Sequence, residues 1–238
     1  AGTMALSGDS TLSLQGNGRT SAYSLTGTWD LTGAGYSWRD LVAKPAGQPN
    51  RLSFQSILNH SGARVPLFHF ELGPLATSGS AEYRVGEKRP LSFSAKTNEF
   101  PAHELVPRFP KLSRYKPAGR VRLSLHGTGG GEGEGRLAVG GEVSLKGASL
   151  TPSEKLAALT NINGSVGFSG ENLKSSRISA RLGGSTITGS GTLSGFTSPA
   201  FSLAFSSPSL ALADLGLRSP GKPLAVQRVQ GNIELRGD

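Results

Sequence analysis

The sequence predicts an all-β protein of mostly antiparallel strands, and three observations lead to this fold class. Apolar and polar residues alternate with a period of two along much of the chain, as they do when successive side chains point to opposite faces of a strand. Glycine-rich turns recur at intervals of roughly 8–12 residues. Signals for helices are scarce. Strands with one apolar and one polar face are typical of antiparallel sheets, because buried parallel strands are apolar on both faces.

The alternation marks six strands clearly. In the first of them Leu91, Phe93 and Ala95 alternate with serines. The other five have the same form and cover residues 121–125, 165–169, 178–182, 201–206 and 233–236. Repeated amphipathic strands of this kind are expected to form an elongated, curved sheet with an apolar groove. The alternative is a closed β-sandwich whose apolar faces bury each other.

One or two short helices are expected beside the sheet. The best candidate runs from Thr151 to Ile162, because Thr151 can act as N-cap, Pro152 suits the first helical position and Glu154 completes a capping box. Single helical turns are plausible at residues 102–106 and 211–215. The glycine-rich residues 128–135 are expected to form a loop.

The composition excludes several classes of protein. The 238 residues include no cysteine, which excludes disulfide scaffolds, cysteine-ligated zinc and thiol nucleophiles. The glycines follow no three-residue period, which excludes collagen. The longest apolar stretch lies near residues 210–217 and is much shorter than the ~20 residues that a transmembrane helix needs. We therefore expect no transmembrane segment within these 238 residues.

Basic residues are concentrated in one part of the chain. The net charge of the chain is +9. Residues 84–122 alone, with ten basic and three acidic residues, have a net charge of +7. A solvated basic edge would explain this concentration, and so would a contact for anionic lipid headgroups or for an acidic protein partner. Nucleic acid is not expected, because aromatic residues are sparse there. The candidate headgroup or partner contacts are Arg108, Lys111, Arg114 and Lys116.

No catalytic constellation is present in the sequence. The four histidines stand at no metal-binding spacing, and neither a nucleophile elbow nor a P-loop occurs. Glu132 and Glu134 lie close together, but within the glycine-rich loop, so they do not indicate a glycosidase pair. We therefore expect a protein that is not an enzyme and that uses no cofactor or metal.

The chain repeats itself with a period of about 110 residues. Residues 27–34 align with residues 141–148, and residues 68–72 align with residues 178–182. The ordered matches predict a first β-rich repeat over residues 1–118 and a second over residues 119–230. Residues 231–238 would begin a third, so we expect the chain to be a fragment of a longer protein. Repeats of amphipathic strands tend to form one continuous sheet.

The second repeat resembles a known family. It contains Gly-x-Val-x-Leu-x-x-Ala at residues 141–148, Ile-x-Gly-x-Val-x-Phe at residues 162–168 and Gly-x-Gly-x-Leu at residues 189–193. An alternating strand that ends in Leu-x-x-Leu follows. These motifs are similar to those of the AsmA-like family, the TamB/YhdP-type periplasmic repeat proteins of Gram-negative bacteria. The resemblance extends over residues 20–238, and the first repeat is a degenerate version.

The resemblance implies a location and a function. Members of the family are anchored in the inner membrane, and their periplasmic part is a long β-sheet groove with an apolar inner face. They support phospholipid transport to the outer membrane and envelope integrity. A lipid conduit of this kind would hold acyl chains on the apolar side chains of its strands. The candidate lipid-binding residues are Leu52, Phe54, Phe68, Phe70, Leu91, Phe93, Leu123, Leu125, Val166, Phe168, Ile178, Leu182, Leu193, Phe201, Leu203 and Phe205.

Two other functions remain open from the sequence. A non-catalytic scaffold could bind protein partners in outer-membrane assembly through sheet edges, which readily accept another strand, or through its basic residues. A carbohydrate-binding or enzymatic β-sandwich is the third reading. Sugar sites favour exposed aromatic residues, and the chain has only 2 Trp and 4 Tyr.

Overall fold

The computed structural model describes residues 4–19, 21–38, 42–130, 137–151, 157–195, 198, 200–215 and 228–237. These residues form an open, antiparallel sheet with a few short helices, so the all-β fold class is confirmed. The chain divides into two compact units. Within each unit the main strands follow one another as neighbours in a single sheet. The closed sandwich is therefore not the fold of this chain.

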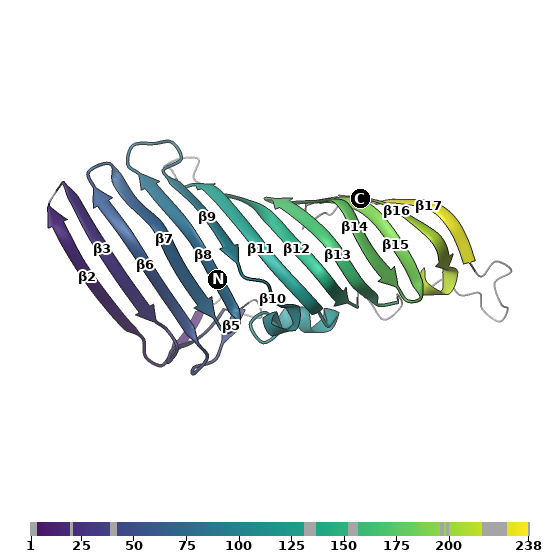
Figure 1. Ribbon diagram of the computed structural model, residues 1–238, viewed down its shortest axis with the longest axis horizontal. Helices are drawn as coiled ribbons and strands as arrows, with labels where there is room; N and C mark the ends of the chain where they lie inside the picture. Colours follow the sequence, from purple (N-terminus) through teal and green to yellow (C-terminus); the bar gives the residue numbers. More distant parts are fainter. Residues whose placement is uncertain are drawn as a thin grey trace. The chain divides into compact units, whose positions relative to one another are not determined.

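The first unit comprises residues 1–100, 107–110 and 122–141. Its main strands are β2 (Thr11–Arg19), β3 (Ala22–Asp30), β6 (Asn50–Asn59), β7 (Gly62–Leu72), β8 (Leu75–Arg84), β9 (Leu91–Thr97) and most of β11 (Ala118–Gly129). They pair in this order (Figure 1). Three short strands, β1 (Met4–Ser7), β4 (Gly35–Trp38) and β5 (Val42–Lys44), form a separate small sheet.

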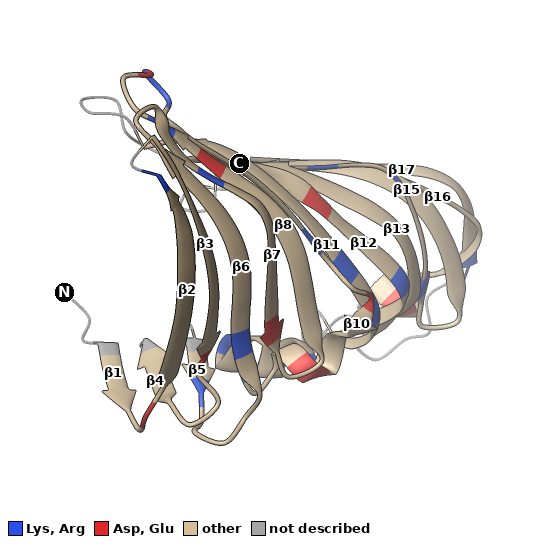
Figure 2. Ribbon diagram, turned by 60° about the vertical axis from the view of Figure 1, so that its left-hand side comes forward, with Lys and Arg blue, Asp and Glu red and all other residues tan. Residues whose placement is uncertain are grey.

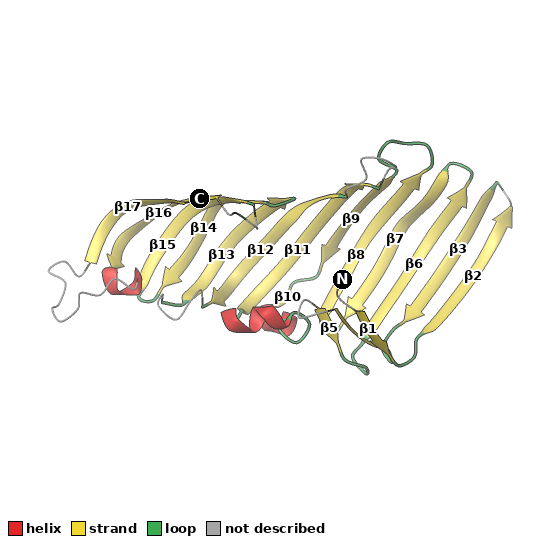
Figure 3. Ribbon diagram, turned by 180° about the vertical axis from the view of Figure 1, so that it is seen from behind, coloured by secondary structure: helices red, strands yellow, loops and turns green. Residues whose placement is uncertain are grey.

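The second unit comprises residues 101–106, 111–121 and 142–238. After the start of β11 it contains β12 (Ala138–Leu150), β13 (Leu159–Ser169), β14 (Asn172–Leu182), β15 (Ser185–Ser194), β16 (Ala200–Ala211) and β17 (Arg228–Gly237), again paired in order. The short β10 (Phe100–Pro101) pairs with β11. Three 3₁₀ helices, η1 (Ala102–Leu105), η2 (Pro110–Tyr115) and η3 (Leu212–Leu215), lie at strand ends (Figure 3).

The structure differs from the expected helix at Thr151–Ile162. Leu159 to Ile162 belong to β13, where Leu159 pairs with Leu182 of β14. Residues 152–156 lie outside the described residues. The helix signal is local, whereas Ile162 is buried in a core with Ala148 and Ala180, so sheet pairing overrides it. The two expected helical turns are present as η1 and η3.

The strands of the two units correspond in detail at a spacing of 110 residues. The β7–β8 pair has a register shift between Val65 and Phe68, and the β14–β15 pair has one between Ser175 and Ile178. Residues 65 and 175 and residues 68 and 178 are therefore equivalent. A bulge of this kind bends a strand and fixes its register. The same backbone irregularity thus recurs at the same place in both units.

Buried residues near the strand ends recur in the same way. Leu72 and Leu182 are both buried, and so are Phe100 and Leu210. The carboxylate of Asp214 in η3 accepts hydrogen bonds from Ser185 Oγ at 2.9 Å and from Gly184 N at 3.2 Å. It thereby ties η3 to the start of β15.

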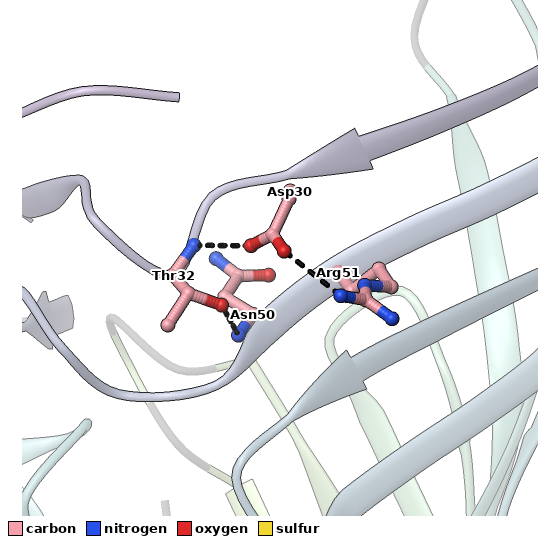
Figure 4. A network of polar contacts seen from close by, with 4 residues as sticks. All are labelled: Asp30, Thr32, Asn50 and Arg51. Atoms are coloured by element: carbon pink, nitrogen blue, oxygen red, sulfur yellow. Dashed lines mark hydrogen bonds and ion pairs between the residues drawn. The ribbon is translucent and has the colours of Figure 1, made fainter. Parts of the chain in front are cut away.

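A polar network ties the end of β3 to the start of β6 (Figure 4). One Asp30 oxygen accepts a hydrogen bond from Thr32 N at 2.9 Å, and the other accepts one from Arg51 Nη2 at 2.9 Å. Hydrogen bonds from Thr32 and Arg51 hold the pKa of the Asp30 carboxyl well below its usual range. Beside this network the Lys44 ammonium is buried and donates to the backbone carbonyls of Leu31, Thr32 and Ala34.

Candidate functional site

Strand register places the apolar candidates of the first unit on one face of its sheet. Residues paired across antiparallel strands point to the same side. Phe54 pairs with Phe68, and Phe68 pairs with Gly79. Gly79 pairs with Ala95, which in turn pairs with Leu125. All eight candidates of this unit are half-buried: Leu52, Phe54, Phe68, Phe70, Leu91, Phe93, Leu123 and Leu125.

Register places apolar candidates of the second unit on one face as well. Phe168 pairs with Leu173, Leu173 pairs with Leu193, and Leu193 pairs with Phe201. A parallel row joins Ile178 through Gly189 to Phe205. The opposite face carries serine, threonine and charged residues. β15 and β16 contain no Lys, Arg, Asp or Glu. Their ribbons therefore have neither blue nor red segments in Figure 2.

Glycines alternate with the large side chains on these faces, and several are covered by a neighbouring ring. A Cβ built on Gly27 would lie 2.4 Å from Phe54 Cζ, and one on Gly127 would lie 2.3 Å from Phe93 Cε1. In the second unit a Cβ on Gly237 would lie 2.5 Å from Phe201 Cε1. A ring can lie flat over a glycine because no side chain stands beneath it. At the covered glycines the aromatic rings therefore lie close to the backbone of the sheet, and the apolar faces are flatter there.

The second unit contains a pocket in its apolar face, which we call the second-unit pocket. Its volume is about 500 Å³ and its surface is almost entirely apolar. Six of the candidates line it: Val166, Ile178, Leu193, Phe201, Leu203 and Phe205. Leu203 and Phe201 keep 41% and 37% of their surface exposed, so the pocket is open to solvent.

Sequence reasoning missed several residues of this pocket. Leu173, Ala180 and Ile187 also line it, together with Gly189 and Gly191. Leu173 and Ile187 stand in the same alternation and could have been found from it. The glycines carry no hydrophobic signal, although they provide the space. Two candidates lie elsewhere: Phe168 is on the same face but outside the pocket lining, and Leu182 is buried beside Leu159.

The basic candidates do not form one surface. Lys111, Arg114 and Lys116 are exposed, on or directly after η2. The Arg114 guanidinium lies over the Tyr115 ring, 4.5 Å from its centroid. Arg108 is different, because only 5% of it is exposed. Its burial removes it from the proposed headgroup or partner contacts.

The described residues show no other chemistry that points to a site. No group of three or more His, Asp or Glu side chains among them could hold a metal ion. His69 Nδ1 lies 2.8 Å from Ser78 Oγ, but both side chains are exposed on the polar face. Within the part of the chain that the structure describes, no helix is long and apolar enough to span a membrane.

Comparisons with known proteins do not identify a family. No protein-family model, no curated protein and no solved structure matches this chain. The apolar faces and the second-unit pocket are the features of the described residues that bear most on function.

Proposed function

We propose that this chain is a non-enzymatic lipid-binding segment whose apolar sheet faces hold acyl chains. The second-unit pocket supports this proposal most directly. It is open, apolar and bounded by exposed Phe201 and Leu203. Ligand pockets commonly measure about 300–1,000 Å³ and have mostly apolar linings. The volume of the second-unit pocket lies within this range.

The energetics favour a ligand that is held without directed chemistry. Each CH₂ group removed from water contributes ~0.8 kcal/mol, so about ten methylene groups buried in the pocket would contribute ~8 kcal/mol before the costs of association. Headgroups would stay in water, since the pocket has almost no polar surface. A catalytic residue is not needed for this role.

The wider role proposed here follows the resemblance to the AsmA-like family. The chain would be a segment of a periplasmic protein that is anchored in the inner membrane. That protein would carry phospholipid to the outer membrane and support envelope integrity. A β-sheet with one apolar face is suited to this role, because an acyl chain can move along it without leaving apolar contact.

A pair of matched variants on one strand tests lipid binding. Leu203 lies on the apolar face of β16, whereas its neighbour Ser202 is exposed on the opposite face and pairs with Thr192. We expect Leu203→Asp to weaken binding of a fluorescent fatty acid by more than ~10-fold, because a carboxylate in the pocket must lose its hydration. Ser202→Asp adds the same charge on the other face and should bind as the unmodified protein does. Equal binding by all three proteins would reject the site.

A scaffold for envelope proteins is the second candidate function. The exposed Lys111, Arg114 and Lys116 favour it, because they lie within a short stretch around η2. An acidic partner would be attracted to such a cluster. Glutamate at all three positions should then weaken capture of that partner and leave fatty-acid binding unchanged. Loss of fatty-acid binding in this triple variant would instead point to a role in lipid contact.

A further inference from the structure

One difference between the two units bears most directly on the pocket. Phe68 in β7 and Ile178 in β14 stand at equivalent places, each directly after the bulge. Each pairs with a glycine of the next strand, Phe68 with Gly79 and Ile178 with Gly189. The two glycines are equivalent too, so the side chain that the preceding strand places opposite the glycine changes from Phe68 to Ile178.

This difference decides whether a ring from the preceding strand covers the glycine. In the first unit a Cβ on Gly79 would lie 2.6 Å from Phe68 Cζ, so the ring lies over the glycine. In the second unit the three atoms nearest to a Cβ on Gly189 belong to Ala204 and Phe205, at 2.5 to 3.1 Å. No aromatic ring from β14 covers Gly189, and this glycine lines the second-unit pocket.

Neighbouring positions strengthen the contrast. Phe70 of the first unit corresponds to Ala180, and Phe93 corresponds to Leu203, at the same spacing of 110 residues. Both smaller residues line the pocket. One replacement runs the other way, since Ala95 corresponds to Phe205, which is also part of the lining.

We infer that Ile178 determines where an acyl chain is retained, so that the second unit holds one chain over Gly189 while Phe68 fills the equivalent place in the first unit. This inference rests on the proposed function and adds a location and a stoichiometry to it. The ligand class is a single acyl chain, which a fatty acid or one chain of a phospholipid can supply. In the first unit the Phe68 ring occupies this position over Gly79.

Reciprocal substitutions test the inference. Ile178→Phe gives the second unit the residue found at the equivalent position of the first, and it should lower the affinity for cis-parinaric acid by more than ~10-fold. Phe68→Ile combined with Phe70→Ala and Phe93→Leu gives the first unit the smaller residues that line the second-unit pocket, and it should add a second binding site. Native mass spectrometry with oleic acid would then show about one bound chain for the unmodified protein and about two for this triple variant. Ser202→Phe adds a ring on the opposite face and is the matched control.

The possible results separate this inference from the proposed function. If the unmodified protein binds no fatty acid, the proposed function fails and the inference fails with it. If it binds and Ile178→Phe binds equally well, the function stands and Ile178 is not the determinant. Displacement of cis-parinaric acid by oleic acid and by dioleoyl phosphatidylglycerol distinguishes the two sources of the chain.

A second variant covers the case in which Ile178→Phe does not fold, as judged by circular dichroism. Gly191 also lines the pocket, and a Cβ there would meet the flexible end of Leu203 at 2.6 Å and the next atom only at 3.4 Å. Gly191→Leu would therefore fill the pocket from the neighbouring strand. It should cause the same loss of fatty-acid affinity, and unchanged affinity would overturn the inference.

Discussion

The same substitution at two positions of β16 should have very different effects on stability. Leu210 has 1% of its surface exposed, whereas Leu203 has 41% exposed. Truncation of leucine to alanine removes apolar surface worth ~0.8 kcal/mol for each buried CH₂, and in a closed core it also leaves a cavity. We expect Leu210→Ala to lower the free energy of unfolding by ~2–5 kcal/mol. Leu203→Ala should cost only about 1 kcal/mol, because its side chain is far less buried and solvent can fill the space.

Urea denaturation at neutral pH measures both changes, provided that the slope of the unfolding free energy against urea concentration stays constant. The expected difference between the two variants is ~1–4 kcal/mol, which a linear extrapolation resolves. Equal losses at both positions would refute the reasoning. Leu203 would then have to be part of a closed core in solution, and the pocket would not be open.

Two further predictions concern the polar contacts at the strand ends. Asp214→Ala should destabilise the fold by ~1–3 kcal/mol, because the buried Ser185 hydroxyl and Gly184 N lose their acceptor; urea denaturation checks this, and an unchanged midpoint would contradict it. The Asp30 pKa is lower in the folded state than its usual 3.8, owing to hydrogen bonds from Thr32 and Arg51. Its stabilising contribution is therefore present above the unfolded pKa and is lost as the pH falls through the folded pKa. Asp30→Asn should be less stable than the unmodified protein at pH 7, and the difference should shrink as the pH falls below 3.8; a difference that does not change with pH would contradict this account.

In the strands where alternation was recognised, the sequence predicted which residues share a face. Alternation depends only on the two-residue period of a strand, and pairing preserves it from strand to strand. For this reason Phe54, Phe68 and Leu125 fall on one face although they come from three different strands. The spacing of the internal repeat also supported the strand assignment, because a strand expected in one repeat has an equivalent strand in the other.

The pocket itself could not be predicted from that alternation. It depends on glycines such as Gly189 and on whether a ring from the next strand covers them. The bulge before Ile178 also shifts the register by an amount that the sequence does not reveal. Both features belong to pairs of strands and are invisible in a single one.

Two further differences have local causes. The helix expected at Thr151–Ile162 rested on local capping residues, whereas Leu159 pairs with Leu182, a residue distant in sequence. Arg108 was grouped with exposed basic residues because it is close to them in sequence. Its guanidinium instead lies against Gly73, where a Cβ would be 2.0 Å from Nη2, and the side chain is buried.

The most direct test of lipid binding is mass spectrometry of an organic extract from the chain, purified from bacteria without detergent. We expect phospholipid or fatty acid at about one acyl chain for each protein molecule, and little or none in Leu203→Asp. A compact protein that carries no lipid and does not bind the dye ANS would contradict the proposed function. Its apolar faces would then be closed in solution.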